Sequence, residues 1–251
     1  METISINFQI PTSWSELSDK QLRYVYSLIA QDFSTDELKT LCLLRWSGAK
    51  VVGRQDSGFY LLKKGKVLFE VTPLTLAELL PALDWLGSVP TSPTRPVKLK
   101  HRAAIAADFS EVPFETYIVV DNLYQGFLST QKDALLDDLA HVLYPGCSAT
   151  LTPEERVSIF YWVASLKDMF AQRFPDFFQP ATANAENLLG SSPNIGKQLQ
   201  ESMDAQIRAL TKGDITKEKE ILSLDTWRAL TELNAQAKEY KQINAKINAK
   251  K

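Results

Sequence analysis

Polar and apolar residues alternate at the start of the chain, and the pattern then changes to helical spacing. The alternation over residues 4–10 predicts a strand with one buried face. A serine followed three residues later by Gln or Glu, the spacing of a helix capping box, occurs at 18–21 and again at 34–37. Each of these predicts the start of a helix, and the second helix is expected to stop at Gly48.

After Gly48 the period shortens to that of strands. Three short apolar runs separated by turn-like sequences predict a small antiparallel sheet, over residues 51–52, 59–62 and 67–71. Leucines at helical spacing follow over 74–83, and Pro81 within them predicts a kink or an early end. The proline-rich stretch 90–96 is typical of a stiff linker.

The middle of the chain is helical and rich in aromatic residues. It predicts three helices, starting near Pro113, Lys132 and Thr152, and the last is apolar on most sides, which is typical of a helix at the centre of a bundle. Of 25 aromatic residues, 23 precede Gln179. Since aromatic side chains contribute much of a core's buried area, we expect the protein to remain folded when shortened after Phe178.

These patterns predict a mostly helical α+β fold. It consists of an N-terminal α+β lobe with a small antiparallel sheet, a helical bundle, a linker and a C-terminal helical arm. The corresponding ranges are 1–96, 97–178, 179–194 and 195–251.

The C-terminal arm carries an apolar stripe at spacings of three and four residues, with Asn244 at one position of the seam. We predict that this stripe binds a partner through Trp227, Leu230, Leu233, Tyr240, Ile243 and Ile247. An exposed stripe of this size must pack against something, whether its own globule, a second copy or a different protein. Residues 195–251 carry a net charge of +3 and the rest of the chain −5, so docking on the globule or on a neighbour is electrostatically favourable.

Composition is that of a soluble globular protein, with 45% apolar and 23% charged residues and a net charge of only −2. Such a charge gives no overall attraction to nucleic acid. No run approaches the ~20 apolar residues of a membrane span, and the N-terminus lacks a signal-peptide pattern. We therefore expect a cytoplasmic protein, which is also compatible with incorporation in a virion. Cys42 and Cys147 are predicted to be free thiols.

Sequence motifs for catalysis are lacking. There are two histidines, and Asp137, Asp138 and His141 share a predicted helix, a spacing that serves an ordinary ion pair as well as a metal. A Walker loop, a dinucleotide glycine fingerprint, a Gly-x-Ser-x-Gly elbow and a Cys-x-x-Cys pair are all absent. We therefore predict no catalytic, cofactor-binding or metal-binding residues, and no enzymatic activity.

Basic residues cluster in three stretches, 63–66, 95–102 and 238–251. Each has the charge to contact phosphate groups, which keeps nucleic-acid binding open as an alternative. Solvated roles at a hairpin tip or at a helix C-terminus account for the same residues, and we favour those roles.

Four segments carry a resemblance to a known group of proteins, namely PTSWSELSDKQLRYV at 11–25, LRWSG at 44–48, LPALDWL at 80–86 and PFETYIVVDNLYQG at 113–126. They resemble an uncharacterised family of prophage-type proteins found among phage structural genes. The C-terminal helix ending in lysines is also similar to small phage tail-assembly chaperones.

The pattern and the resemblance together predict a non-enzymatic phage-type assembly or structural protein that acts through protein–protein contacts. It would be a tail-assembly chaperone or a tail or virion component, and its partner a tail protein, a tape-measure protein or a second copy. A small nucleic-acid-binding or regulatory protein is the first alternative. An enzyme with a carboxylate-based site is the second, because such pairs need no fixed sequence spacing.

Overall fold

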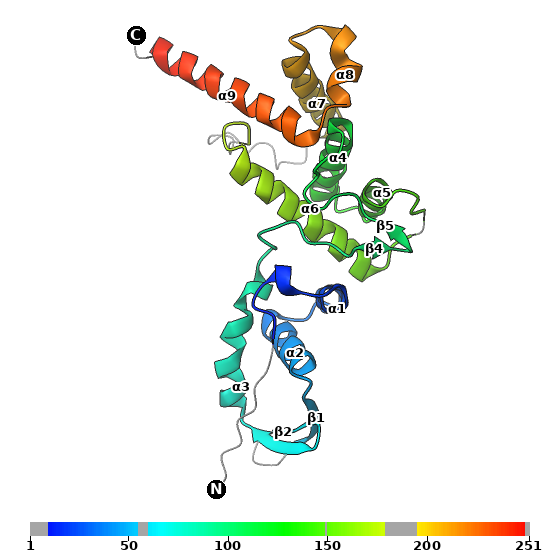
Figure 1. Ribbon diagram of the computed structural model, residues 1–251, viewed down its shortest axis with the longest axis vertical. Helices are drawn as coiled ribbons and strands as arrows, with labels where there is room; N and C mark the ends of the chain where they lie inside the picture. The colour runs from blue at the N-terminus through cyan, green and yellow to red at the C-terminus, as the bar shows by residue number, and fades with distance from the viewer. Residues whose placement is uncertain (1–9, 55–59, 149, 179–194, 249–251) are drawn as a thin grey trace. The chain divides into compact units, whose positions relative to one another are not determined.

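The computed structural model describes residues 10–54, 60–148, 150–178 and 195–248 (Figure 1). It consists of two compact units, Met1–Pro90 and Thr91–Lys251. The predicted mostly helical α+β class is confirmed. The strand predicted over 4–10 falls almost wholly outside the described residues.

Unit 1 opens with a 3-10 turn, Trp14–Glu16, followed by α1 (Asp19–Ile29) and α2 (Thr35–Ser47). Both predicted capping boxes are formed, each with its two reciprocal hydrogen bonds. Gly48 ends α2 in the left-handed conformation with φ of 69°, which glycine adopts without steric cost.

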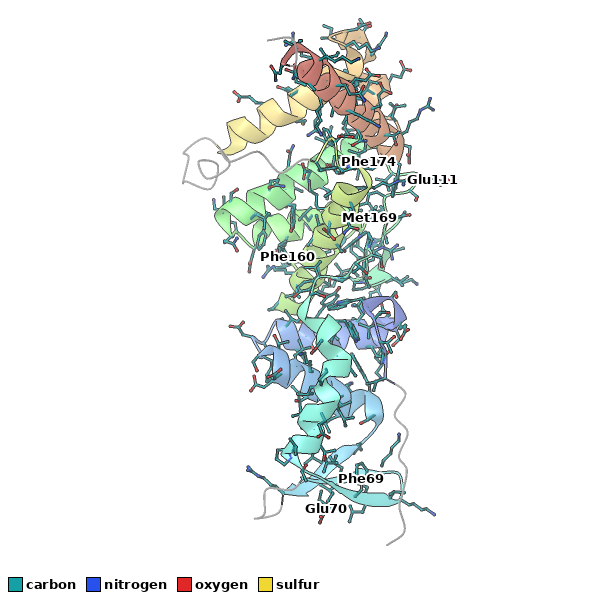
Figure 2. All side chains as sticks on the ribbon, turned by 90° about the vertical axis from the view of Figure 1, so that its left-hand side faces the viewer. Phe69, Glu70, Glu111, Phe160, Met169 and Phe174 are labelled. Atoms are coloured by element: carbon teal, nitrogen blue, oxygen red, sulfur yellow. The ribbon has the colours of Figure 1, made fainter. Side chains whose placement is uncertain are left out.

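The predicted meander is confirmed as a three-stranded antiparallel sheet of order β1-β2-β3, made of β1 (Lys50–Arg54), β2 (Tyr60–Lys64) and β3 (Val67–Val71). Phe69 and Glu70 are neighbours on β3 (Figure 2), and Phe69 pairs with the buried Leu62. The leucine-rich stretch then forms α3 (Pro73–Leu79) and a 3-10 segment, Leu80–Gly87. The α-helix therefore ends just before Pro81, as the sequence predicts.

Trp14 connects the start of unit 1 to its end. Its indole Nε1 donates to the carbonyls of Trp85 and Ser88, at 3.0 and 3.1 Å. Its ring stacks on Tyr26 of α1, with centroids 6.1 Å apart. The first segment, α1 and the Leu80–Gly87 segment therefore share one small core.

Unit 2 begins with a short hairpin, β4 (Lys98–Leu99) and β5 (Arg102–Ala103), that the sequence did not predict. The two turn residues, Lys100 and His101, both have positive φ, 45° and 67°. Glycine and asparagine are the usual residues at such positions. The turn therefore lacks the usual sequence signature, and its two residues belong to the basic stretch 95–102.

The bundle of unit 2 is formed first by α4 (Phe114–Thr130), α5 (Ala134–Leu143) and α6 (Pro153–Arg173). Beyond them come α7 (Ile195–Thr211), a 3-10 turn at Ile215–Lys217, α8 (Glu218–Leu222) and α9 (Thr226–Asn248). Phe160 and Met169 lie on α6, and Phe174 follows its end (Figure 2).

The sequence predicted a separate C-terminal arm. In the structure, α7 and α9 instead belong to the same core as α4 and α6. Leu210, Leu230 and Leu233 are buried in one hydrophobic cluster with Trp162 and Phe170. The chain just before α9 pairs with the chain just before α4, where Phe114 N donates to the Leu224 carbonyl at 2.8 Å. The predicted boundary after residue 96 also differs from the structure, in which unit 2 begins at Thr91. Pro96 lies inside unit 2, where its carbonyl accepts a hydrogen bond from the Tyr144 hydroxyl.

Two tryptophans fix the loop that precedes α4. Trp162 of α6 donates from Nε1 to the Ala107 carbonyl at 2.8 Å, and Trp227 of α9 donates to the next carbonyl, Asp108, also at 2.8 Å. Phe109, which follows, is fully buried and has a positive φ of 62°. A bulky residue holds that conformation only when its surroundings impose it.

Ending the chain after Phe178 is therefore expected to unfold unit 2, contrary to the prediction from aromatic content. The cut removes the burial of Trp227, Leu230 and Leu233, each worth about 1.5–3 kcal/mol, out of a domain stability of about 5–15 kcal/mol. Near-UV circular dichroism and urea unfolding measure the loss. The matched control ends after Gln242 and keeps the buried part of α9, so native-like spectra are expected. A folded, cooperative chain ending at Phe178 would contradict the docking of α9.

Candidate functional site

The six residues predicted to bind a partner separate into two groups along α9. The first group, Trp227, Leu230 and Leu233, faces the core of its own unit, where Leu230 and Leu233 are 0% and 4% exposed. The Trp227 ring lies edge-on to Phe170 and Phe174, at centroid distances of 5.4 and 5.7 Å. These three side chains hold α9 to the bundle, which is the contact with its own globule that the sequence left open.

The second group is Tyr240, Ile243 and Ile247, called the outer stripe from here on, with exposed fractions of 67%, 56% and 51%. The spacing of three and four residues places all three on one face of α9. This C-terminal half of the helix extends beyond α4 and α8 (Figure 1). The outer stripe is therefore the part of the predicted surface that remains accessible to another molecule.

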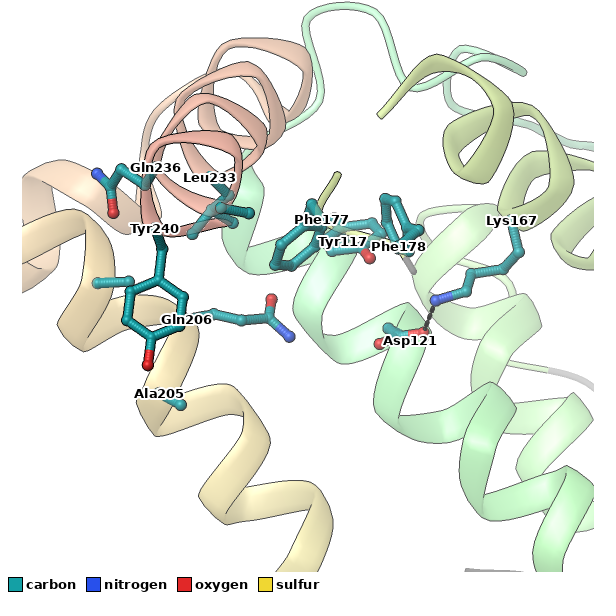
Figure 3. A pocket seen from close by; sticks show the side chains of 12 residues that line it. Tyr117, Asp121, Lys167, Phe177, Phe178, Ala205, Gln206, Leu233, Gln236 and Tyr240 are labelled. Atoms are coloured by element: carbon teal, nitrogen blue, oxygen red, sulfur yellow. Dashed lines mark hydrogen bonds and ion pairs between the residues drawn. The ribbon is translucent and has the colours of Figure 1, made fainter. Parts of the chain in front are cut away.

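A groove of about 590 Å³, the α7–α9 groove, lies beside the buried half of α9 (Figure 3). Its walls come from α4, α6, α7 and α9 and from the turn that follows α6. The residues that line it include Tyr117, Asp121, Lys167, Phe178, Gln206 and Tyr240. Tyr240 also belongs to the outer stripe, so the two features meet at this residue.

One wall of the groove, the turn after α6, is held to α9 by polar contacts. The Asn234 Oδ1 of α9 accepts from the backbone N–H groups of Asp176 and Phe177, at 2.9 and 3.1 Å. Lys241 forms an ion pair with Asp176 at 2.7 Å. The groove therefore has a fixed wall on this side.

The groove also contains an ion pair between Asp121 of α4 and Lys167 of α6 (Figure 3). Both side chains are about one-fifth exposed, at 19% and 20%. The Lys167 ammonium also lies 5.1 Å from the centre of the Phe178 ring, within cation–π range. Since the two charges satisfy each other, this part of the groove presents little net charge to a ligand.

Two residues of the groove lining each have a side-chain oxygen that is buried and has no hydrogen-bond partner among the described residues. These oxygens are the Tyr117 hydroxyl and the Gln206 Oε1, and neither exposes appreciable surface to the groove. Tyr117 is only 1% exposed, and burial, reinforced by Asp121, raises the pKa of its phenol well above the ordinary value. The phenol therefore stays protonated and able to donate, and leaving such groups unsatisfied costs free energy.

Sequence reasoning missed this groove because its residues come from distant segments. Tyr117 follows helical core spacing, and nothing in the sequence distinguishes it from a core tyrosine with a bonded hydroxyl. Gln206 is a polar residue in an amphipathic helix, where a solvated position is the ordinary expectation. Only the packing of α7 against α4 and α9 brings them together.

The acidic and histidine cluster of α5 forms ion pairs. Arg156 donates to both carboxylate oxygens of Asp137, at 2.9 and 2.8 Å, and this hydrogen bonding holds the pKa of Asp137 below its usual value. His141 lies 3.9 Å from Asp138. Within the described ranges, no three His, Cys, Asp or Glu side chains come together in a group that could hold a metal ion.

The two cysteines are free and buried, as predicted. Burial raises the pKa of the Cys42 thiol to about 12, so it is un-ionised at neutral pH and a poor nucleophile.

The basic stretch 95–102 is partly engaged within unit 2. Arg95 donates to the Ile105 carbonyl at 2.7 and 3.0 Å and lies 5.2 Å from the centre of the Trp162 ring. Lys100 pairs with Glu155 at 3.0 Å. Both cations therefore have structural roles. Among the helices described, none is long and apolar enough to cross a membrane.

Substituting Tyr117→Phe is expected to leave the fold intact and to change the free energy of unfolding by between zero and a gain of about 1 kcal/mol. The reason is that the lost hydroxyl has no hydrogen-bond partner within the described ranges and is costly to bury. Urea unfolding of both proteins measures this difference. A destabilisation above 1 kcal/mol would show that the hydroxyl makes a structural hydrogen bond.

Substituting Asp137→Asn is expected to destabilise the protein by about 1–2 kcal/mol at pH 7, because a charge-assisted pair with Arg156 becomes a neutral one. The pKa of Asp137 is lowered on folding, so its contribution is complete above the unfolded value of about 3.9 and declines as the pH falls through the lower folded value. The difference in unfolding free energy between the unchanged protein and Asp137→Asn should therefore be constant from pH 7 to about 5 and shrink below about pH 4. A pH-independent difference would exclude this ion pair as its source.

Comparison with known proteins gives no further assignment. The chain matches no family model, no curated protein and no solved structure. The roles of its residues therefore follow from the geometry and chemistry of this chain alone.

Proposed function

We propose that this protein is a non-enzymatic, phage-type assembly or structural protein that acts by binding other proteins. In this proposal it is a tail-assembly chaperone or a tail or virion component, working in the host cytoplasm or within the particle. The resemblance of four of its segments to prophage-type proteins found among phage structural genes supports the phage setting.

The observation that carries the proposal is the division of α9 into a buried half and an exposed half. Leu230 and Leu233 anchor the helix, whereas Tyr240, Ile243 and Ile247 are more than half exposed on one face of the same helix. Such a stripe of large apolar side chains, rooted in a folded core, is typical of a surface that docks against another protein. Lys246, which is exposed and adjacent to Ile247, would favour an acidic partner surface.

The nucleic-acid alternative has less support from the geometry. Arg95 and Lys100, from the basic stretch 95–102, already bind groups of their own unit. Their guanidinium and ammonium groups are thereby less available to phosphate. A salt-dependent shift of labelled DNA or RNA at physiological ionic strength would nevertheless favour that alternative.

The test replaces Ile243 and Ile247 together with aspartate. Binding to the products of neighbouring phage structural genes, and self-association, are measured by co-purification and by sedimentation with purified proteins. We expect at least tenfold weaker association, because burying each large side chain contributes about 1.5–3 kcal/mol. The melting temperature should stay within a few degrees, since neither side chain packs in the core.

The matched control places the same charges on the opposite face of the same helix, through Gln242→Asp with Ala245→Asp. Both positions are exposed. The control should bind as the unchanged protein does. Equal binding by all three proteins would remove the outer stripe from the interface and with it the main support for the proposal.

A further inference from the structure

The strand β3 is an open edge of the unit 1 sheet. In the described part of the chain it pairs only with β2, in a regular register over all five residues. It contains neither a proline nor a bulge, which are common ways of protecting a sheet edge. The opposite edge, β1, is better protected, because its register shifts between Val51 and Gly53 and it has Lys50 and Arg54 at its ends. The sheet is therefore more readily extended at β3.

The turn between β2 and β3 determines which backbone groups of β3 point away from the sheet. Lys64 and Val67 pair directly, and only Gly65, with φ of 60°, and Lys66 lie between them. The pair that flanks a two-residue turn exchanges hydrogen bonds, and bonded and non-bonded pairs alternate from there along the strands. The N–H and C=O groups of Leu68 therefore point away from β2. Leu68 makes no backbone hydrogen bond to any other described segment.

Apolar side chains lie along this edge on both faces of the sheet. Leu68 is 54% exposed on one face. On the other face, Val51, Leu62 and Phe69 lie opposite one another across the three strands, and this apolar row ends at Phe69 (Figure 2). Val67, which is 38% exposed, is on the same face as Phe69. A further strand with apolar side chains would continue the row and bury area that is now exposed.

The sequence of this edge is complementary to itself. When two copies of β3 pair antiparallel about Leu68, the Leu68 side chains of the two copies face each other. Val67 of each copy then faces Phe69 of the other and continues the apolar row. Lys66, exposed in the turn, faces the exposed Glu70 of the other copy, so two opposite-charge pairs form. A register centred on Phe69 would place Leu68 opposite Glu70 and lose both charge pairs.

We propose that unit 1 binds a second copy of this chain through β3, by antiparallel pairing centred on Leu68. The two sheets then form one continuous sheet of six strands. The Leu68 N–H of each copy donates to the Leu68 carbonyl of the other, and every contact occurs twice, as in any two-fold interface. This surface is separate from the outer stripe, so the inference does not rest on the proposed function.

The experiment uses the full chain carrying Ile243→Asp with Ile247→Asp, so that the outer stripe does not contribute to self-association. Sedimentation from about 1 to 300 µM should show a reversible monomer–dimer equilibrium, because a short strand pair is a small interface. Hydrogen exchange of the Leu68 amide should slow as the protein concentration rises, since this N–H is bonded only in the dimer. The Val67 amide faces β2 in both states and is the internal reference.

A substitution at the centre of the interface locates the contact. Leu68→Asp brings two carboxylates face to face and should weaken dimer formation at least tenfold. The matched control is Leu74→Asp, which makes the same change on α3 at a residue that is 71% exposed, and it should dimerise as the background protein does. Both variants should keep the melting temperature of the background within a few degrees, because each changed side chain is more than half exposed.

Two charge reversals test the register. Lys66→Glu and Glu70→Lys, made singly, each place like charges opposite one another twice in the dimer and should weaken it about five- to tenfold. Made together, they restore both opposite-charge pairs, so dimer formation should return to within about twofold of the background. Lys20→Glu and Glu78→Lys, made singly, are the controls. They make the same changes of charge at exposed positions of α1 and α3 and should leave the dimer unchanged.

Three outcomes would overturn the inference. A chain that stays monomeric in this background has no pairing through β3, and the proposed function is untouched because the outer stripe was already removed. A dimer that survives Leu68→Asp, or that the paired reversal fails to restore, forms through another surface or register. Protection of the Leu68 amide at every concentration would mean that a strand of the same chain covers this edge, and residues 4–10 are the segment that the sequence predicts as a strand.

Discussion

Unit 2 depends on two hydrogen bonds from tryptophan side chains to consecutive backbone carbonyls. Trp162 on α6 and Trp227 on α9 bind the carbonyls of Ala107 and Asp108, so a single loop sets the positions of two helices that are distant in sequence. Next to it, both the backbone N–H and the hydroxyl of Thr226 donate to the Val112 carbonyl, at 2.9 and 2.7 Å. Buried carbonyls need partners, and the carbonyls of Asp108 and Val112 obtain theirs only if α9 is in place. The core and the groove both follow from this requirement.

Anchoring α9 at one end gives its two halves different roles. The buried half contributes apolar area to the core and forms part of the groove through Leu233. The other half leaves Tyr240, Ile243 and Ile247 exposed on a helix that is already formed. A partner would therefore not have to order this helix on binding, which lowers the entropic cost of association. Under the proposed function, stability and recognition are separated along one helix, so substitutions in the outer half would change binding without loss of the fold.

The sequence predicted local features better than packing. The capping boxes at Ser18 and Ser34 and the end of α2 at Gly48 depend on residues within a few positions of one another, and they formed as expected. The β4–β5 turn was missed because Lys100 and His101 occupy positions that usually carry glycine or asparagine. Periodicity identifies the apolar face of α9 but not what covers it, and the core of its own unit covers Leu230 and Leu233. The Tyr117 hydroxyl has no hydrogen-bond partner among the residues that the structure describes, and no sequence pattern records which atoms lie near it in space.

The pairing of Trp227 with Asp108 has a consequence for how the chain is made. These residues are 119 positions apart, and contacts of such long sequence separation form slowly because a large loop must close first. Unit 1 has its core within the first 90 residues and can fold while the ribosome is still extending the chain. Unit 2 cannot close until the residues through Leu233 have emerged, and until then the surface that receives them around Phe170 is open to aggregation and to chaperones. Slower translation of the segment before α9 would lengthen that exposed interval, whereas unit 1 would be unaffected.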